Sequence, residues 1–245
     1  MASRILSSIL HAVILHKLVL HHAKHGYDHT FSMMQVDDAL EWLKRNGVDW
    51  SRPLRVLDLG CGSGTFGGAL LQRGCDVIFA DEGDWLEKDL PRTRFRKINI
   101  DSDSLSPLGR FDLVVCSNVI EHLRHPTRLL ASLSSLLEPG GFVYLSWTNW
   151  LSPWGGHDFS PFHYLGPGLG PKVFDKLHKR PRLLKPYENL FPTYIGSTLR
   201  FLRQQAGIEI VKLAPRYYTE LTWLMHLPIL REFLAWNCVV LLRRR

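Results

Sequence analysis

Residues 56–67 read VLDLGCGSGTFG, an apolar run that ends in a glycine-rich loop. The run is typical of a buried β-strand, and residues 65–73 after it predict a helix. A glycine loop between a strand and a helix suits a nucleotide, because glycines let the backbone approach the ligand and a helix N-terminus offers free N–H groups. The loop contains G-x-G-x-G from residue 60 and G-x-G-x-x-G from residue 62. The stretch by itself therefore leaves the nucleotide open.

Strand and helix patterns alternate on both sides of this loop. The run FDLVVCS (111–117) is almost continuously apolar, as a strand buried on both faces should be. A capping box of Ser32 and Gln35 predicts where an early helix begins. This alternation predicts a doubly wound α/β fold with a parallel sheet covered by helices on both faces. Up to residue 150 the predicted strands are 54–59, 76–81, 95–100, 111–117 and 142–147, and the predicted helices are 33–46, 65–73, about 84–90 and 126–137.

The pattern breaks after Thr148 and resumes near residue 195. The stretch 148–192 holds seven of the fourteen prolines, together with many glycines and aromatic residues, and is too long for an ordinary connection. After it we expect two late strands that pair antiparallel at the sheet edge. The predicted organisation is an N-terminal helical cap (1–50) and one domain (51–245) with an insertion at about 149–194. The late elements are a helix at 195–206, a strand at 208–214, a helical segment at 219–234 and a strand at 237–244.

Charge is unevenly placed along the chain. Of a formal net charge of +7, residues 151–245 carry 14 Lys and Arg against 6 Asp and Glu, and residues 172–185 carry six against one. A basic half favours an anionic partner, although a solvated basic face is the commoner meaning of a charge run. The four scattered cysteines form no C-x-x-C pair, which favours a reducing, cytoplasmic setting.

The N-terminal residues 5–20 have apolar spacing near 3.6, which predicts an amphipathic helix. His11, His16 and Lys17 interrupt the apolar run, so the run is too short for a membrane span. No small-residue motif typical of signal-peptide cleavage follows it. Such a helix can pack on the domain, dimerise or lie on a membrane surface. Localisation is therefore expected to be cytoplasmic, with peripheral membrane contact as one option.

Asp58 discriminates between the candidate nucleotides. It lies in the first strand, two residues before Gly60, where a carboxylate would repel the two charges of a pyrophosphate. A sulfonium cofactor with an amino-acid tail instead offers an ammonium group, which a carboxylate attracts. Asp81, at the end of the next strand, is placed for ribose hydroxyls in either case. The residues thus favour S-adenosylmethionine over NAD.

The chain resembles the class I S-adenosylmethionine-dependent methyltransferases of the small-molecule, type 11-like family. Four motifs carry the resemblance in the family's order: VLDLGCGSGTFG, FADE, FDLVVCSNVIEHLRHP and LLEPGGFVYLSW. It implies a Rossmann-like seven-stranded sheet, mostly parallel, with an antiparallel last strand. It also implies S-adenosyl-L-methionine as the cofactor.

The resemblance further implies roles for individual residues. Asp58 would bind the amino group, Gly60, Cys61 and Gly62 would offer backbone contacts, and Ser117 and Asn118 would line the methionine moiety. Asp81 with Glu82 would bind the ribose hydroxyls. Asp101 with Ser102 would flank the adenine, and Asp101 is preferred over Asp103 as the acidic residue on that side. In related enzymes the N-terminal helices often cover the site. The resemblance therefore implies that Tyr27 and His29 close over the cofactor.

Methyl transfer to a hydroxyl or carboxyl acceptor benefits from a base. His122 follows the fourth strand, whereas His157 and His163 lie in the insertion, beside Asp158 and Tyr164. These three histidines are the candidate catalytic groups. No metal site is predicted, because His21 and His25 have ligand spacing but no third ligand in view.

The acceptor is expected to be a small or lipid-like, possibly anionic molecule. An RNA or protein acceptor is the first alternative, because the basic charge favours it. However, the residues after the fourth predicted strand are SNVIE and not the N-P-P-Y-like motif that holds the amine of a flipped base. Two further alternatives for the function are a nicotinamide-dependent oxidoreductase and a protein that binds the cofactor without catalysing a reaction. Nucleic acid is not expected as a partner, and the oligomeric state stays open.

Overall fold

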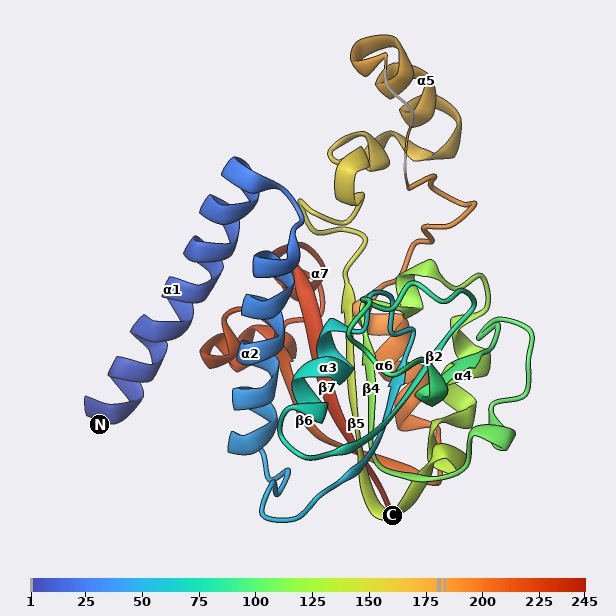
Figure 1. Ribbon diagram of the computed structural model, residues 1–245. Coiled ribbons are helices and arrows are strands. Elements are labelled where there is room, and N and C mark those ends of the chain that lie inside the picture. The colour runs from blue at the N-terminus through green and yellow to red at the C-terminus, as the bar shows by residue number, and fades with distance from the viewer. Residues whose placement is uncertain (1, 180–181, 183) are drawn as a thin grey trace.

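The computed structural model describes residues 2–179, 182 and 184–245, with side chains in the first helix described from residue 14 onward. Its centre is a seven-stranded sheet with the order β3-β2-β1-β4-β5-β7-β6 (Figure 1). The last strand, β7, runs antiparallel to both β5 and β6, while the other pairings are parallel. The strands are β1 Arg55–Leu59, β2 Asp76–Asp81, β3 Phe95–Lys97, β4 Phe111–Ser117, β5 Leu137–Thr148, β6 Ile208–Pro215 and β7 Asn237–Arg244. The predicted fold class is confirmed.

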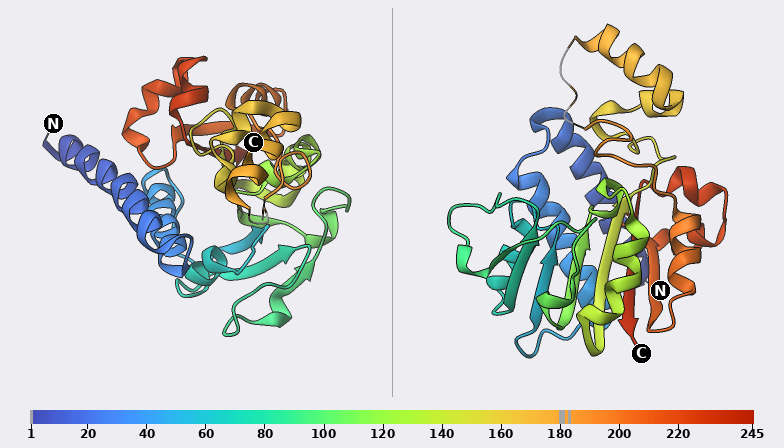
Figure 2. Two further views of the ribbon diagram at one scale, coloured as in Figure 1. Left: turned by 90° about the horizontal axis from the view of Figure 1, so that it is seen from above. Right: turned by 90° about the vertical axis from the view of Figure 1, so that its right-hand side faces the viewer.

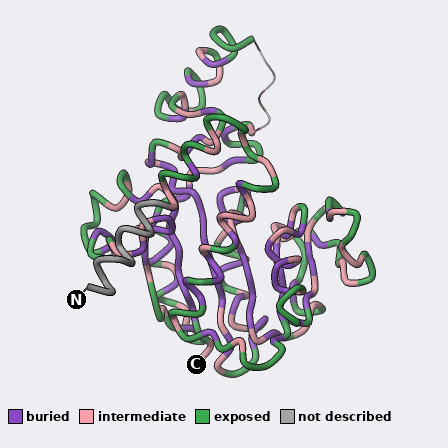
Figure 3. The backbone as a smooth tube through the Cα atoms, turned by 60° about the vertical axis from the view of Figure 1, so that its left-hand side comes forward, coloured by how far each residue is buried: buried purple, intermediate pink, exposed green. Residues whose placement is uncertain are grey.

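Helices cover both faces of the sheet because neighbouring strand residues point to opposite sides. Val56 belongs to a buried cluster with residues of α2 (His29–Arg45) and α3 (Thr65–Leu71), whereas Leu57 belongs to a second cluster with residues of α4 (Pro126–Ser132) and α6 (Ile195–Arg203). The central strands are buried on both sides, as Figure 3 shows in purple. They form a rigid base for whatever lies at their carboxyl ends.

The N-terminal helix α1 (Ala2–His25) lies outside α2, as two views agree (Figure 2). Its described part packs through Leu18 on Phe31 of α2 and on Tyr217. The apolar residues predicted for its first half lie outside the described side chains. Within the described part of the chain, no helix is long and apolar enough to cross a membrane.

Four predicted elements differ in the structure. Helix α2 begins at His29, because Asp28 caps it by accepting a hydrogen bond from Phe31 N at 2.8 Å, so the capping box at Ser32 is wrong. Residues 84–90 form no helix. The Arg92 guanidinium donates to backbone carbonyls there and stabilises an irregular loop.

The other two are boundary errors. The helix predicted at 126–137 ends as α4 at Ser132, continues as a 3₁₀ turn η4 (Leu133–Leu136), and β5 begins at Leu137. The segment 219–234 is two pieces, η7 (Thr219–His226) and α7 (Leu230–Leu234), because Pro228 between them has no N–H to donate. Further 3₁₀ turns are η1 Arg92–Arg94, η2 Ser106–Leu108, η3 Ile120–His122, η5 His157–Phe159 and η6 Phe162–Leu165.

The insertion extends beyond the carboxyl ends of the parallel strands and carries α5 (Gly166–His178) at its far end (Figure 1). It has a small aromatic cluster of its own, in which Phe159, Phe162 and Phe174 lie with ring centroids 5.4–6.1 Å apart. The stretch is therefore partly helical, with its own packing.

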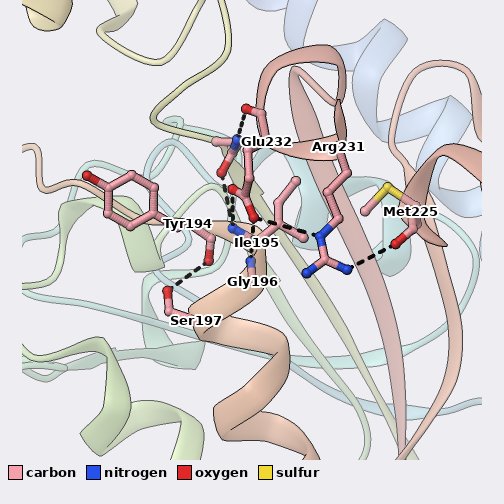
Figure 4. A network of polar contacts seen from close by, with 8 residues as sticks. Tyr194, Ile195, Gly196, Ser197, Met225, Arg231 and Glu232 are labelled. Carbon is pink, nitrogen blue, oxygen red and sulfur yellow. Dashed lines mark hydrogen bonds and ion pairs between the residues drawn. The ribbon is translucent and has the colours of Figure 1, made fainter. Parts of the chain in front are cut away.

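One residue, Glu232, contacts both ends of the insertion through its side chain and its backbone (Figure 4). Glu232 of α7 accepts hydrogen bonds from Ile195 N at 3.0 Å and from Gly196 N at 2.7 Å, where α6 begins. Its backbone carbonyl accepts from Asn149 Nδ2, at the point where the insertion starts. The insertion thus leaves and rejoins the domain at one polar network.

Candidate functional site

Two cavities meet at the carboxyl edge of the sheet. The loop cavity, of about 290 Å³, lies between the glycine loop, the ends of β2 and β3, and the residues after β4. The helix cavity, of about 460 Å³, lies between α1, α2 and the insertion. Asn118 and His122 line both, so these two residues mark the junction. Ligand sites of open α/β sheets lie at this edge.

The glycine loop brings backbone close to the loop cavity but has few free N–H groups. Gly60 N and Cys61 N both donate to the carbonyl of Ala80, and Gly62 N donates to Asp81 at 2.8 Å. Gly60 has φ +73°, and a Cβ there would lie 2.4 Å from Val119 Cγ2. Because the first three amides of the loop are already bonded, the loop is poorly suited to a pyrophosphate, which binds through such amides.

Asp58 lies beneath the loop, 3% exposed, and accepts a hydrogen bond from Gly67 N at 2.8 Å. Burial raises the pKa of this carboxyl to about 7, opposed by the Gly67 hydrogen bond and assisted by the negative charge of Asp81. The side chain does not line either cavity. A cation that approaches it would favour its ionised form.

The end of β2 lines the loop cavity as predicted. The Asp81 carboxylate accepts from Gly62 N and from Glu82 N, which fixes its orientation. Glu82 lies beside it on the cavity wall, and so does Trp85, a residue that the sequence reasoning did not single out. The adjacent carboxylates suit a diol, and the indole ring offers a face for stacking.

Asp101 lines the loop cavity, whereas Asp103 does not. Both oxygens of Asp101 accept backbone N–H groups, from Arg124 and from His125, each at 2.9 Å. Asp101 therefore fixes the loop that leads into α4 and shapes the wall of the cavity. Asp103 and Ser102 hydrogen-bond to each other within the turn.

Asn118 has a left-handed backbone, with φ +56°, and its side chain is held by two buried groups. Its Oδ1 accepts from Arg216 Nη1 at 3.2 Å and from Asn237 Nδ2 at 2.9 Å. Because Oδ1 is occupied, the amide nitrogen is the polar atom of the Asn118 side chain that a ligand at the junction could use. Ser117, one residue earlier, bonds Ser146 on the neighbouring strand at 3.2 Å and lines neither cavity.

The three candidate histidines have different surroundings. His122 Nδ1 lies 2.9 Å from the carbonyl oxygen of Asn189, so it donates there and leaves Nε2 with a free lone pair. His157 lines the helix cavity, and burial, assisted by His122 and His163, lowers its pKa to about 3. His163 is buried away from the cavities, against Trp150 and Tyr164. Two of the three thus come together, and His163 packs within the insertion.

Glu121 was not singled out from the sequence. It is 1% exposed, and its Oε1 accepts from Thr148 N at 2.9 Å. Burial raises the pKa of this carboxyl, with His122 and the Thr148 hydrogen bond acting in the opposite direction. The run IEH alone does not indicate that the carboxyl points inward, because this depends on the 3₁₀ turn η3.

Three aromatic residues, called the aromatic roof here, line part of the helix cavity: Tyr27, Trp154 and Trp236. Tyr27, which follows α1 and is half-exposed, accepts a hydrogen bond from Trp154 Nε1 of the insertion. Trp154 stacks on Trp236 with ring centroids 6.2 Å apart. His29, expected over the cofactor, lines neither cavity and bonds Glu87 at 3.0 Å. The cap and the insertion therefore meet above one space.

Of the fourteen site residues expected from the sequence, eight line a cavity: Tyr27, Gly60, Asp81, Glu82, Asp101, Asn118, His122 and His157. The other six line neither cavity: Asp58, Cys61, Gly62, Ser102, Ser117 and His163. Sequence reasoning missed Arg216 and Asn237, which hold Asn118 from strands at the far end of the chain. No local sequence pattern indicates that an arginine at the end of a late strand is buried and contacts a distant residue.

Residues 27–213 match the model of a family described as a methyltransferase domain. An uncharacterized methyltransferase of Mycolicibacterium gilvum (strain PYR-GCK) is 33% identical over 221 residues, which cover 86% of this chain and 84% of that protein. A second, from Mycobacteroides abscessus, is 32% identical over 217 residues and covers 83% and 81%. A solved S-adenosylmethionine-dependent methyltransferase from Mesorhizobium loti aligns with a TM-score of 0.58 at 20% identity, over 85% of this chain and all of that one.

Proposed function

Because this chain belongs to the methyltransferase domain family, as a class I S-adenosylmethionine-dependent enzyme, we propose that it methylates a small apolar or lipid-like acceptor in the helix cavity. The observation that carries the proposal is the junction of two cavities at Asn118 and His122. One cavity has the polar lining that a nucleoside needs, and the other has an apolar lining. A methyl donor and its acceptor would meet where they join.

The loop cavity accommodates the nucleoside end of S-adenosylmethionine. Asp81 and Glu82 would offer carboxylates to the ribose hydroxyls, and residues 99–101, which also line this cavity, would lie beside the adenine. The amino-acid tail would extend over the glycine loop, where the cationic ammonium is drawn towards Asp58. The Asn118 amide, fixed by Arg216, would donate to the carboxylate of the tail.

Methyl transfer is an in-line displacement that depends mainly on holding donor and acceptor close together and on excluding water. The aromatic roof of Tyr27, Trp154 and Trp236 supports such exclusion. The free lone pair of His122 at the junction is the group that we assign to activation of the acceptor. His157 lies next to it, with ring centroids 5.6 Å apart.

The lining of the helix cavity indicates the chemistry of the acceptor. Leu15, Leu18 and Phe31 come from the helices, and Tyr217 and Trp236 come from the late strands and their connection. Among the lining residues that the structure describes there is no lysine or arginine, so an apolar acceptor is favoured over an anionic one. A partly enclosed cavity of about 460 Å³ also favours a small molecule over RNA or a folded protein.

Exposed apolar side chains support delivery of the acceptor from a lipid surface. They gather on η7 and α7, where Ile229 is 76% and Trp223 58% exposed, and α7 leads directly to Trp236 in the cavity wall. Monomeric soluble proteins seldom expose large contiguous apolar patches. The net charge of +7 would add attraction to anionic lipids. The residues are Leu221, Trp223, Ile229, Leu230, Phe233 and Leu234.

The test uses the full chain with S-adenosylmethionine labelled on its methyl group and a lysate separated into lipid, small-molecule, RNA and protein pools. Label is expected in the lipid or small-molecule pool, and label confined to RNA or protein would contradict the acceptor class. Flotation with vesicles that contain phosphatidylglycerol tests the surface, and W223D/I229D is expected to reduce co-flotation. Calorimetry with S-adenosylmethionine tests cofactor binding independently of any acceptor.

A further inference from the structure

Three potential metal ligands from two distant parts of the chain converge at the junction of the cavities. Glu121 and His122 come from η3 after β4, and His157 comes from the insertion. One ligand atom from each lies within 4.8 Å of the other two, the only such group of three among the residues that the structure describes. We propose that Glu121, His122 and His157 bind one divalent transition-metal ion, with Zn²⁺ as the preferred ion.

The ligand atoms are available for an ion. Glu121 Oε2 and His157 Nε2 are buried, and neither has a hydrogen-bond partner in the described structure. An uncompensated pair of buried polar atoms costs free energy, which an ion between them would recover. The Thr148 N–H holds the other oxygen of Glu121 at 2.9 Å, so Oε2 is the carboxylate oxygen that is left for an ion.

His122 has the outer-shell contact that is common for a metal-binding histidine. Such a residue usually donates its second ring N–H to a carbonyl or carboxylate, which fixes the tautomer and makes the ligating nitrogen more basic. His122 Nδ1 makes this contact with the Asn189 carbonyl, at 2.9 Å. Asn189 lies in the returning part of the insertion, so the metal site and the insertion would support each other.

The geometry requires only a small closure. Metal–ligand bonds of about 2.1 Å place neighbouring ligands of a tetrahedral zinc ion roughly 3.4 Å apart. The ligand atoms here, within 4.8 Å of one another, need to approach by at most about 1.4 Å. Two histidines and one carboxylate are an established catalytic zinc set, which keeps a fourth position open.

The open position gives the acceptor site a more specific chemistry, and this part rests on the proposed function. With the lone pair of His122 bound to the ion, the ion takes the place of His122 in activating the acceptor. His122 and His157 both line the helix cavity, so the fourth position faces the acceptor. A hydroxyl oxygen bound there loses its proton to water more readily, because the ion stabilises the alkoxide or phenolate. That oxygen then forms a bond to the methyl carbon, and the electron pair of the broken C–S bond stays on sulfur. The acceptor class is therefore an apolar molecule with a hydroxyl group.

The experiment measures metal binding without turnover. Full-length protein freed of metal with a chelator is titrated with Zn²⁺ by calorimetry and with Co²⁺ by visible absorption. One equivalent is expected to bind, with Co²⁺ bands typical of low coordination number, and E121Q and H157N are each expected to weaken binding at least tenfold. H125N removes a nearby exposed histidine outside the set and is expected to bind as the wild type does.

The experiment distinguishes failure of the proposed metal site from failure of the proposed methyltransferase function. Absence of stoichiometric binding, or binding that neither E121Q nor H157N weakens, overturns the metal site. Cofactor binding and methyl transfer to an apolar acceptor would then still stand, with the His122 lone pair acting as a base. Circular dichroism of both variants verifies that they are folded, and two chemically different substitutions keep the result interpretable if one of them misfolds.

Discussion

Arg216 donates a hydrogen bond from Nη1 to Oδ1 of Asn118 across 3.2 Å, although 98 residues separate the two in the chain. Arg216 is 2% exposed, and its guanidinium also bonds Ser146 and lies over the rings of Tyr144 and Tyr217. The contact places a buried cation directly behind the cavity junction. It explains how a side chain in the left-handed backbone after β4 keeps a single orientation.

Substitution R216M should weaken binding of S-adenosylmethionine about tenfold, because Asn118 loses a charge-assisted hydrogen bond worth roughly 1.5 kcal/mol. Calorimetry measures the affinity, and thermal unfolding reports any loss of stability. The control is R243M, which removes an exposed arginine that also lies over an aromatic ring, Phe142. Equal affinities for R216M and wild type would show that Asn118 does not depend on Arg216.

Substitution G60A should lower both stability and cofactor affinity, the latter at least tenfold. An added Cβ would lie 2.4 Å from Val119, in a backbone with φ +73°. G74A is the matched control, because Gly74 has φ +81° with nothing within 4 Å of an added Cβ, so it measures backbone strain alone, about 1 kcal/mol. The double variant G60A/V119A should recover part of the stability lost in G60A. If G60A and G74A behave alike in both measurements, crowding by Val119 has no effect.

Cofactor affinity should rise with pH through the pKa of Asp58, about 7. Below that value the carboxyl is protonated and cannot attract an ammonium, so affinity should fall about tenfold for each pH unit. Measurements between about pH 5.5 and 7.5 keep the cofactor's amino group, with a pKa of about 8, mostly charged. D58N can still accept the Gly67 hydrogen bond, and its affinity should be lower at pH 7.5 and nearly flat with pH. A slope unchanged by D58N would exclude Asp58 as the titrating group.

The raised pKa of Asp58 also predicts how the free energy of unfolding depends on pH in the absence of cofactor. The native pKa is raised above the ordinary value of about 3.9, so between about pH 4 and 7 the folded state binds more protons than the unfolded state. The contribution of Asp58 to the free energy of unfolding therefore falls as pH rises through this window. Chemical denaturation of wild type and D58N at several pH values should give a difference with this sign. A difference that is constant with pH would contradict the raised pKa.

Substitution E232Q should loosen the insertion. The amide offers one acceptor oxygen where the carboxylate serves both Ile195 N and Gly196 N, so one of these two hydrogen bonds is lost. Ile195 N keeps Asn149 Oδ1 as an acceptor at 3.2 Å, so the expected cost is about 1 kcal/mol, the net value of one hydrogen bond. Thermal unfolding should show a lower midpoint, and limited proteolysis should cut within residues 149–194 sooner than in wild type. E138Q removes an exposed carboxylate outside the network and should match wild type in both assays. Cleavage at the wild-type rate in E232Q would mean that other contacts hold the insertion.

Local patterns predicted the elements well where the chain is periodic. The apolar run 111–117 is β4 with the predicted bounds, because continuous burial on both faces requires continuous apolar residues. The early helix was misjudged because Asp28 and Ser32 are both good caps, and the structure uses the former. The helix at 126–137 ends early because Leu137 pairs with Phe111 in the sheet, a contact far away in the sequence.

The amino-acid sequence by itself determined the order of strands and helices, the glycine loop and the carboxylates at strand ends, since each depends on residues close together in the chain. It could not determine which side chains share a cavity. The approach of His157 to Glu121 and His122, the support of Asn118 by Arg216, and the roof of Tyr27 and Trp154 each join segments that only folding brings together. Such contacts are set by the packing of the insertion and the late strands on the sheet, and no local spacing encodes them.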